Sequence, residues 1–244
     1  MEHELWLTAL FNNYLAGLGN ALLSLVGMHA ENPTHPWQNW IVMELFVVAL
    51  LMILVAVLRS SLSVERPGSI QHLFEEIYGF LDYQSHEVGI HHTEKYINYF
   101  GTLFIFILAM NLIGIIPAFE SPTMEPAVPA ALAVCTFLYY NAMGLGANGI
   151  KYLAHFAGPV WWMAWLMIPI EIISHLARPL SLTVRLYGNM FAGEQVISVF
   201  LGLVKPLIPV IFMGLHVFVA LVQAYVFTAL AMIYVSMATA HGHD

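Results

Sequence analysis

The stretch of residues 169–195, PIEIISHLARPLSLTVRLYGNMFAGEQ, places charged and polar side chains inside a long apolar run. On insertion scales, one charged residue at the centre of a membrane helix costs about 2.5 to 3.5 kcal/mol. Packing alone does not explain several such costs, so these side chains should face protein or water. Residues of this kind favour a path for an ion or a proton. They are Glu171, His175, Arg178, Arg185, Asn189 and Glu194.

The composition of the whole chain is that of an integral membrane protein. Of the 244 residues, 60% are hydrophobic and only 9% are Asp, Glu, Lys or Arg, whereas soluble domains carry about 25% charged residues. Long apolar runs indicate α-helices rather than a β-barrel. The seven Lys and Arg residues are scattered and form no basic face, which argues against nucleic-acid binding. We therefore expect an all-α, polytopic helical bundle forming one membrane domain.

Apolar runs and polar interruptions divide the chain into helical regions. Residues 5–28 lie in an outer N-terminal segment, 1–36, and carry three asparagines. They fit an amphipathic helix along the membrane interface or, alternatively, a span. One-sided apolar spacing predicts a surface amphipathic helix on the cytoplasmic side at 69–88. Apolar runs predict spans at 41–58, 96–116 and 130–147, followed by two long helices at 161–204 and 207–238.

The run 161–204 is too long for one upright span. As a continuous helix it measures roughly 66 Å, about twice the ~30 Å hydrocarbon core. Pro169 and Pro179 can kink a helix without ending it. The run either breaks into two spans or forms one strongly tilted helix. A tilted helix needs a partner that shelters its polar face from lipid.

Helical spacing sorts the polar residues of the two long runs. Glu194 lies nine residues after Arg185 and turns to the opposite side of the helix, so separate routes meeting near Arg185 fit better than one straight channel. If the runs form a hairpin around residues 205–209, Glu194 should meet His216 near the turn. Gln223 should then lie deeper, toward Arg185. One stripe of the first helix carries Glu171, His175, Arg178, Arg185 and Asn189.

Arginine gives the stripe its distinctive chemistry. The guanidinium group of Arg185 does not lose its proton in a protein, so it is a poor proton relay and a permanent electrostatic gate. A carboxylic acid that passes close to it is driven to ionise, because a nearby cation lowers a carboxyl pKa by about 1 to 3 units. Lysine is a weaker substitute, since it can lose its proton when buried.

The runs RPLSLTVRLYGNMFAGE and HVFVALVQAYVFTALAMIYVSMA, together with NLIGIIP, resemble subunit a of the F-type ATP synthase, the stator channel subunit of the FO motor. The resemblance implies that Arg185 is the essential stator arginine, facing the carboxylate of each c subunit in the rotor ring. It also implies two offset half-channels for protons. The outer one would use Glu194, His216, Asn189 and Gln223, and the inner one Glu171, Ser181 and Arg178.

The same resemblance implies the setting of the protein. The two long helices are expected to be steeply tilted against the c ring, and the b subunits of the peripheral stalk and the rest of the complex are the other protein partners. The subunit would conduct ions without catalysing a reaction itself, in the inner membrane of a bacterium, with no cofactor or metal. The resemblance assigns no role to His175.

The distribution of basic residues predicts the orientation. Arg59, Arg66, Lys95 and Lys151 fall in two connections on one side of the membrane, and only Lys205 falls on the other. The side richer in Lys and Arg is usually cytoplasmic. This places the amino terminus outside and the carboxyl terminus in the cytoplasm.

Two other function classes would leave different patterns in the sequence. A secondary ion transporter with a charged site at the membrane midplane predicts inverted repeats and discontinuous helices, and an intramembrane hydrolase needs a nucleophile with its base or zinc ligands. Neither pattern is evident in the sequence. The single cysteine, Cys135, rules out an internal disulfide. The cluster His86, Glu87, His91 and His92 does not have the spacing of a zinc site, and we expect surface residues there.

Overall fold

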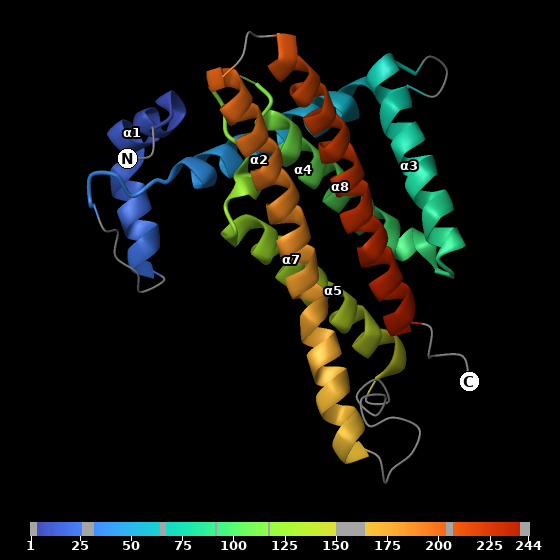
Figure 1. The fold of residues 1–244 in the computed structure, drawn as a ribbon. Helices are drawn as coiled ribbons and strands as arrows, with labels where there is room; N and C mark the ends of the chain where they lie inside the picture. Colours follow the sequence, from blue (N-terminus) through green and yellow to red (C-terminus); the bar gives the residue numbers. More distant parts are fainter. Residues whose placement is uncertain are drawn as a thin grey trace.

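The computed structural model describes residues 4–25, 32–63, 67–90, 92–116, 118–149, 164–203 and 207–239. The regular structure in these ranges is entirely helical, which confirms the predicted all-α polytopic bundle (Figure 1). The elements are α1 (Trp6–Leu25), α2 (Asn39–Ser61), α3 (Ser69–Glu87), α4 (Thr93–Ile113), η1 (Pro122–Met124), α5 (Ala127–Asn148), α7 (Ala164–Leu203) and α8 (Leu207–Thr239).

Within the described ranges, α2, α4, α5 and residues 210–239 of α8 are long and apolar enough to cross a membrane. The region 96–116 is helical only to Ile113, three residues short of the prediction. The chain turns there because Gly114 leaves room for Ser121: a Cβ atom on Gly114 would lie 2.9 Å from the backbone nitrogen of Ser121. The Ser121 hydroxyl donates a hydrogen bond to the carbonyl of Met110 at 2.8 Å, which stabilises the end of the helix.

Helix α7 decides between the two alternatives for its region. It runs without a break from Ala164 to Leu203, through both Pro169 and Pro179. Each proline removes one backbone hydrogen bond, but the neighbouring turns hold the helix together. The alternative of two separate spans is therefore wrong. At 1.5 Å per residue the helix is roughly 60 Å long, so it can lie in a bilayer only with a strong tilt.

Helices α7 and α8 form the expected antiparallel hairpin (Figure 1). Three contacts show the register, from the turn downward. The rings of Phe200 and Phe212 stack at 4.4 Å, and Asn189 bonds to Gln223 further along. Near the other end, the guanidinium group of Arg178 lies over the ring of Tyr234, 5.3 Å from its centroid.

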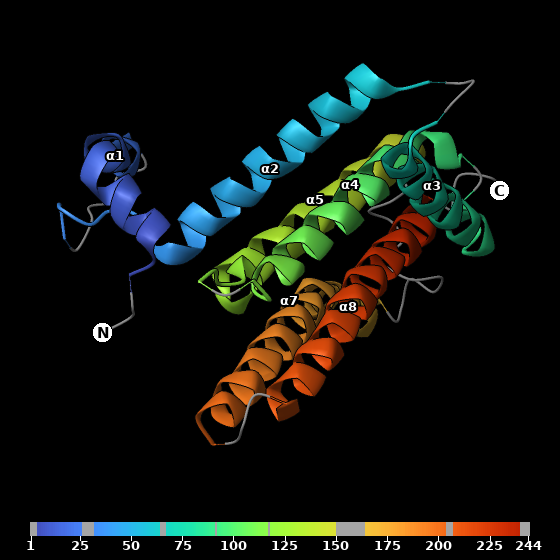
Figure 2. The same ribbon diagram turned by 90° about the horizontal axis from the view of Figure 1, so that it is seen from above.

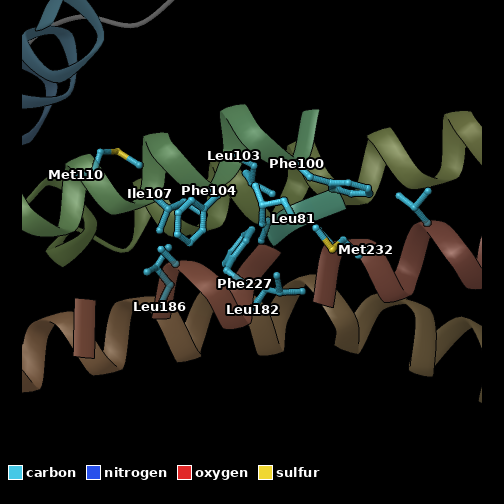
Figure 3. Packing of buried hydrophobic residues seen from close by; sticks show 14 of the residues in the cluster. Leu81, Phe100, Leu103, Phe104, Ile107, Met110, Leu182, Leu186, Phe227 and Met232 are labelled. Atoms are coloured by element: carbon cyan, nitrogen blue, oxygen red, sulfur yellow. The ribbon is translucent and has the colours of Figure 1, made fainter. Parts of the chain in front are cut away.

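The buried core lies between this hairpin and α4, with α5 and α3 beside it (Figure 3). Small side chains let α8 approach its neighbours closely, since Ala220, Ala224 and Ala231 are fully buried. Helix α7 contributes Leu182 and Leu186, which are 3% and 0% exposed. Because these leucines face the core, the opposite face of α7 is left open among the described residues.

The surface helix α3 is fastened to the bundle rather than only floating on the membrane. Its residue Leu81 is buried, and its Gln84 accepts a hydrogen bond from the hydroxyl of Tyr225 at 3.2 Å. Just beyond the helix, the carbonyl of Val88 accepts a bond from Ser236 of α8 at 2.9 Å. A helix is thus present where an amphipathic helix was predicted at 69–88. Its last turns and the residue after it contact the second half of α8.

Candidate functional site

Arg185 lies near the middle of α7, and its side chain is exposed on the open face of that helix. In the described parts of the chain, the ion pairs join histidines to Glu or Asp, and none involves Arg185. A cation that cannot lose its proton is thus presented outward, unpaired with any carboxylate among the described residues of its own subunit. In a membrane this arrangement requires an anionic partner or water.

The face around Arg185 is built from small side chains. At spacings of three and four residues, α7 carries Ser174, Ala177, Ser181, Gly188 and Ala192 on the same side as the arginine. A Cβ atom on Gly188 would meet nothing within 4 Å. Small residues let another membrane helix approach closely, so this face is shaped for a helix from another chain.

Asn189 lies on the side of Arg185 nearer the turn of the hairpin, and it connects the open face of α7 to the protein interior. Its amide nitrogen donates a 2.7 Å hydrogen bond to the side-chain carbonyl of Gln223, which is only 3% exposed. The Nε2 atom of Gln223 is buried and has no hydrogen-bond partner in the described structure. A buried donor without a partner is costly, which makes the site a suitable place for water.

His216 lies about two turns from Gln223 toward the hairpin turn, with 3% of its surface exposed. Neither ring nitrogen has a hydrogen-bond partner in the described structure. Its ring packs directly on Gly193: a Cβ atom there would overlap Nδ1 and lie 2.9 Å from Cε1 of the histidine. A cavity of about 300 Å³ adjoins the ring, lined by Asn189, Ala192, Gly193, Val196, Phe212, Leu215, His216 and Val219.

Glu194 follows Gly193 on the other side of α7, half-buried and close enough to Glu120 for the two carboxylates to repel each other. Glu120 also accepts a hydrogen bond from the amide of Asn39 at 3.3 Å. It lines a second cavity, of about 410 Å³, at the start of α2. Its walls are Gln38, Asn39, Trp40, Glu120, Ser121, Met124, Glu125 and Phe191.

At the other end of α7, His175 is 8% exposed and joins α7 to α5. The amide nitrogen of Asn141 donates to the carbonyl of Phe137 at 2.7 Å, so its oxygen faces the histidine, 2.9 Å from Nε2. Because an amide oxygen is an acceptor, Nε2 carries the hydrogen. The hydroxyl of Tyr140 lies 3.3 Å from the same nitrogen.

The other residues of the predicted inner route are not gathered at one point. Glu171 lies half-buried one turn before His175, and Ser181 is exposed one turn before Arg185. Arg178 is half-buried and stacked on Tyr234, and a cation over a tyrosine ring is held there by attraction to the ring face. Its guanidinium group is thus engaged within the subunit, in contrast to that of Arg185.

Comparison with known proteins supplies the family. The family model described as "ATP synthase A chain" matches residues 41–236. The chain belongs to this family. It is 56% identical over 235 residues to ATP synthase subunit a of Solibacter usitatus (strain Ellin6076), an alignment that covers 96% of this chain and 100% of that protein. It is also 49% identical over 245 residues to ATP synthase subunit a of Koribacter versatilis (strain Ellin345), with both chains covered completely.

Membership of the ATP synthase subunit a family, with four helices able to cross a membrane among the described residues, identifies a multi-pass protein of the bacterial inner membrane that serves ATP synthesis and proton transport. Helix α1 precedes the matched region.

Reasoning from the sequence missed the acidic turn between α4 and α5 of this ATP synthase subunit. Glu120 and Glu125 belong to the connection between α4 and α5, which the sequence indicates only as a short polar turn. Nothing in the spacing shows that the turn lies against Phe191 of α7. One usable signal was the pair of carboxylates in a connection too short to reach far from the membrane.

The histidines near the end of α3 were expected to be surface residues. His86 is exposed and lies 3.8 Å from Asp82; His91 falls outside the described residues. Where the structure describes the chain, no group of three or more His, Cys, Asp or Glu side chains is placed to hold a metal ion.

Proposed function

We propose that this chain is the stator channel subunit of the FO motor, in which protons pass by two offset routes to and from carboxylates on a rotor ring of c subunits. One observation carries the proposal: the permanently charged Arg185 is exposed on a face of small residues, with no carboxylate of the described structure paired with it. The missing anion is then a carboxylate of another subunit that moves past.

The outer route begins in the cavity beside Glu120 and Glu125. From there a proton reaches Glu194, whose neighbour Gly193 packs against the ring of His216. The cavity next to His216 opens toward Asn189 and Gln223. The unpartnered ring nitrogens of His216 and the free Nε2 of Gln223 would be satisfied by water there. The proton then neutralises a rotor carboxylate.

Arg185 gives the rotation of the c ring its direction. A neutral carboxyl group can rotate into lipid, whereas a charged one costs far too much. After almost a full turn the group meets the inner route, loses its proton toward Glu171 past Ser181 and Arg178, and is attracted to Arg185. The fixed charge also prevents a direct leak between the routes. The membrane potential contributes about 2.3 kcal/mol per charge for each 100 mV.

The remaining parts of the proposal concern setting and partners. The subunit is non-catalytic and works with the c ring, the b subunits and the rest of the complex. Basic residues support an amino terminus outside and a carboxyl terminus in the cytoplasm: Arg59 ends α2 and Lys95 begins α4, at the same end of the bundle. A midplane transporter would predict discontinuous helices, but α7 is continuous.

Cysteine cross-linking tests the rotor interface. In a Cys135→Ser background, Gly188→Cys places a thiol in open space on the Arg185 face. We expect it to form a disulfide with a cysteine placed beside the essential carboxylate of the c subunit in the assembled complex. Leu180→Cys is the matched control, since that side chain is 65% exposed on the same helix but turned well away from Arg185.

A cross-link from position 188 and none from position 180 supports the proposal. The reverse pattern would place the ring on a different face of α7. Purification offers a coarser check, because a stator channel subunit should be isolated with a c ring and a secondary transporter should not.

A further inference from the structure

Helix α1 has an apolar face that the described structure leaves largely uncovered, apart from an edge-to-face contact between the rings of Trp6 and Phe119. Its five large exposed side chains follow each other mostly at steps of four residues, which puts them on one side of the helix. Their exposed fractions range from 48% to 83%, for Trp6, Leu10, Tyr14, Leu18 and Leu25. A continuous exposed apolar stripe indicates contact with a membrane or a partner.

The opposite face of α1 is fixed to the segment before α2. The backbone nitrogen of Trp37 donates to the side-chain oxygen of Asn12 at 3.0 Å, and the Trp37 indole donates to the carbonyl of Leu15 at 2.9 Å. Gly19 allows the close approach, because a Cβ atom there would lie 2.9 Å from Cγ of Pro36. These contacts prevent α1 from turning about its own axis, so the direction of the apolar stripe is set.

The helix also lies across the direction of the spans. Figure 2 shows α1 beside the first residues of α2 and roughly perpendicular to α2, α4 and α5. In the same view, the segment 32–38 lies on the side of α1 turned away from α3, which lies at the far end of the spans. Since the segment covers the buried face of α1, the apolar stripe on the other face is directed toward the depth of the membrane.

A charged group lies on the side of α1 opposite the apolar stripe. Glu4 accepts a 2.7 Å hydrogen bond from the Asn12 amide and lies 3.2 Å from the Nδ1 atom of His35. The bond from Asn12 lowers the pKa of the Glu4 carboxyl, which keeps it charged. This charged group is near the segment 32–38 and away from the stripe. Within α1 itself there is no charged residue.

We propose that α1 lies flat in the outer interface of the membrane, with its stripe in the upper acyl-chain region and its Asn12 side facing water. Trp6 and Tyr14 are side chains that favour this depth. The absence of charge in the helix fits anchoring by apolar contact rather than by attraction to anionic headgroups. The anchor precedes the family match at residue 41. Its insertion into an interface does not rest on the proposed function, whereas the choice of the outer side rests on the orientation proposed there.

Fluorescence quenching in the assembled complex tests the anchor. A bimane probe is attached to Tyr14→Cys in the Cys135→Ser background, and the complex is reconstituted in phosphatidylcholine vesicles. Thr34→Cys is the matched control, because Thr34 is exposed on the segment that covers the other face of α1. Quenching is compared between phosphatidylcholine with a nitroxide high on its acyl chain and a water-soluble nitroxide. A labelled Leu18→Cys variant repeats the measurement on the stripe.

We expect the lipid nitroxide to quench the probe at position 14 severalfold more than the probe at position 34, and the soluble nitroxide to give the reverse order. Position 18 should behave as position 14. Strong quenching of position 14 by the soluble nitroxide would show the stripe in water and overturn the inference. Shielding of positions 14 and 18 from both quenchers would show a protein partner on the stripe, and would overturn it as well.

Discussion

Replacement of Arg185 by alanine is expected to abolish ATP synthesis driven by a proton gradient while the complex still assembles. The side chain is exposed and makes no ion pair within the described structure, so the substitution leaves no buried partner behind and should not unfold the subunit. It removes the only group in the proposed mechanism that drives a rotor carboxylate to ionise. ATP synthesis by reconstituted vesicles, normalised to assembled complex, measures the effect.

Two further variants test whether the permanent charge of arginine is needed, and whether it is needed at position 185. Arg185→Lys should also lose most of its activity, because a lysine at membrane depth can lose its proton and has one point charge in place of the planar fork. Arg178→Lys is the matched control seven residues earlier on α7. It keeps a cation beside Tyr234, and most of the activity should remain. Substantial coupled synthesis by Arg185→Ala would refute the assignment of the gate.

Replacement of Glu194 by glutamine should lower proton transport by about 100-fold, the lower end of the range for losing a positioned proton-transfer group. Glutamine has nearly the same shape, so the half-buried position and the contact of Gly193 with His216 should be preserved. It has no titratable proton and cannot pass one from the outer cavity to His216. ATP-driven acidification of inverted membrane vesicles gives the measurement.

The control for this variant is Glu76→Gln, an isosteric change at an exposed residue of α3, which should leave acidification unchanged. Passive proton leak through membranes stripped of the soluble part of the complex should fall in Glu194→Gln as well. An undiminished rate in Glu194→Gln would mean that protons reach the rotor by a route that avoids this carboxylate.

The sequence was enough to predict the elements and the register of the long hairpin. Periodicity located α2, α3, α5 and α8, and the polar residues of α7 had to share a face at helical spacing. Counting back from the turn brought Glu194 near His216, and the packing of Gly193 on the His216 ring agrees with that order. These predictions depend on local geometry and on a short connection, both of which a sequence reports directly.

Contacts between segments that are distant in the sequence could not be predicted from local patterns. The pairing of His175 with Asn141 joins residues 34 positions apart, and it depends on how α5 crosses α7. The approach of Glu120 to Glu194 depends on the turn at Gly114 and on the bonds of Ser121. The periodicity also could not distinguish two separate spans from one tilted helix α7. Whether the helix continues through Pro169 and Pro179 is decided by the packing around these prolines.

The structure also explains why the residue before Glu194, at position 193, is a glycine. Any side chain at position 193 would occupy the space of the His216 ring, so a glycine is needed there for the histidine to pack against α7. This arrangement places the His216 ring against the residue that precedes Glu194. Helical spacing alone had placed Glu194 away from the Arg185 stripe and left that connection unexplained.

The most direct test is a density map of the assembled complex in a lipid bilayer at a resolution that shows side chains. We predict that the guanidinium group of Arg185 faces the ring, and that in at least one rotational state it lies within hydrogen-bonding reach of a c-subunit carboxylate, directly or through one water. A guanidinium group directed at lipid, or paired with a carboxylate of its own chain and closed off from the ring, would contradict the account.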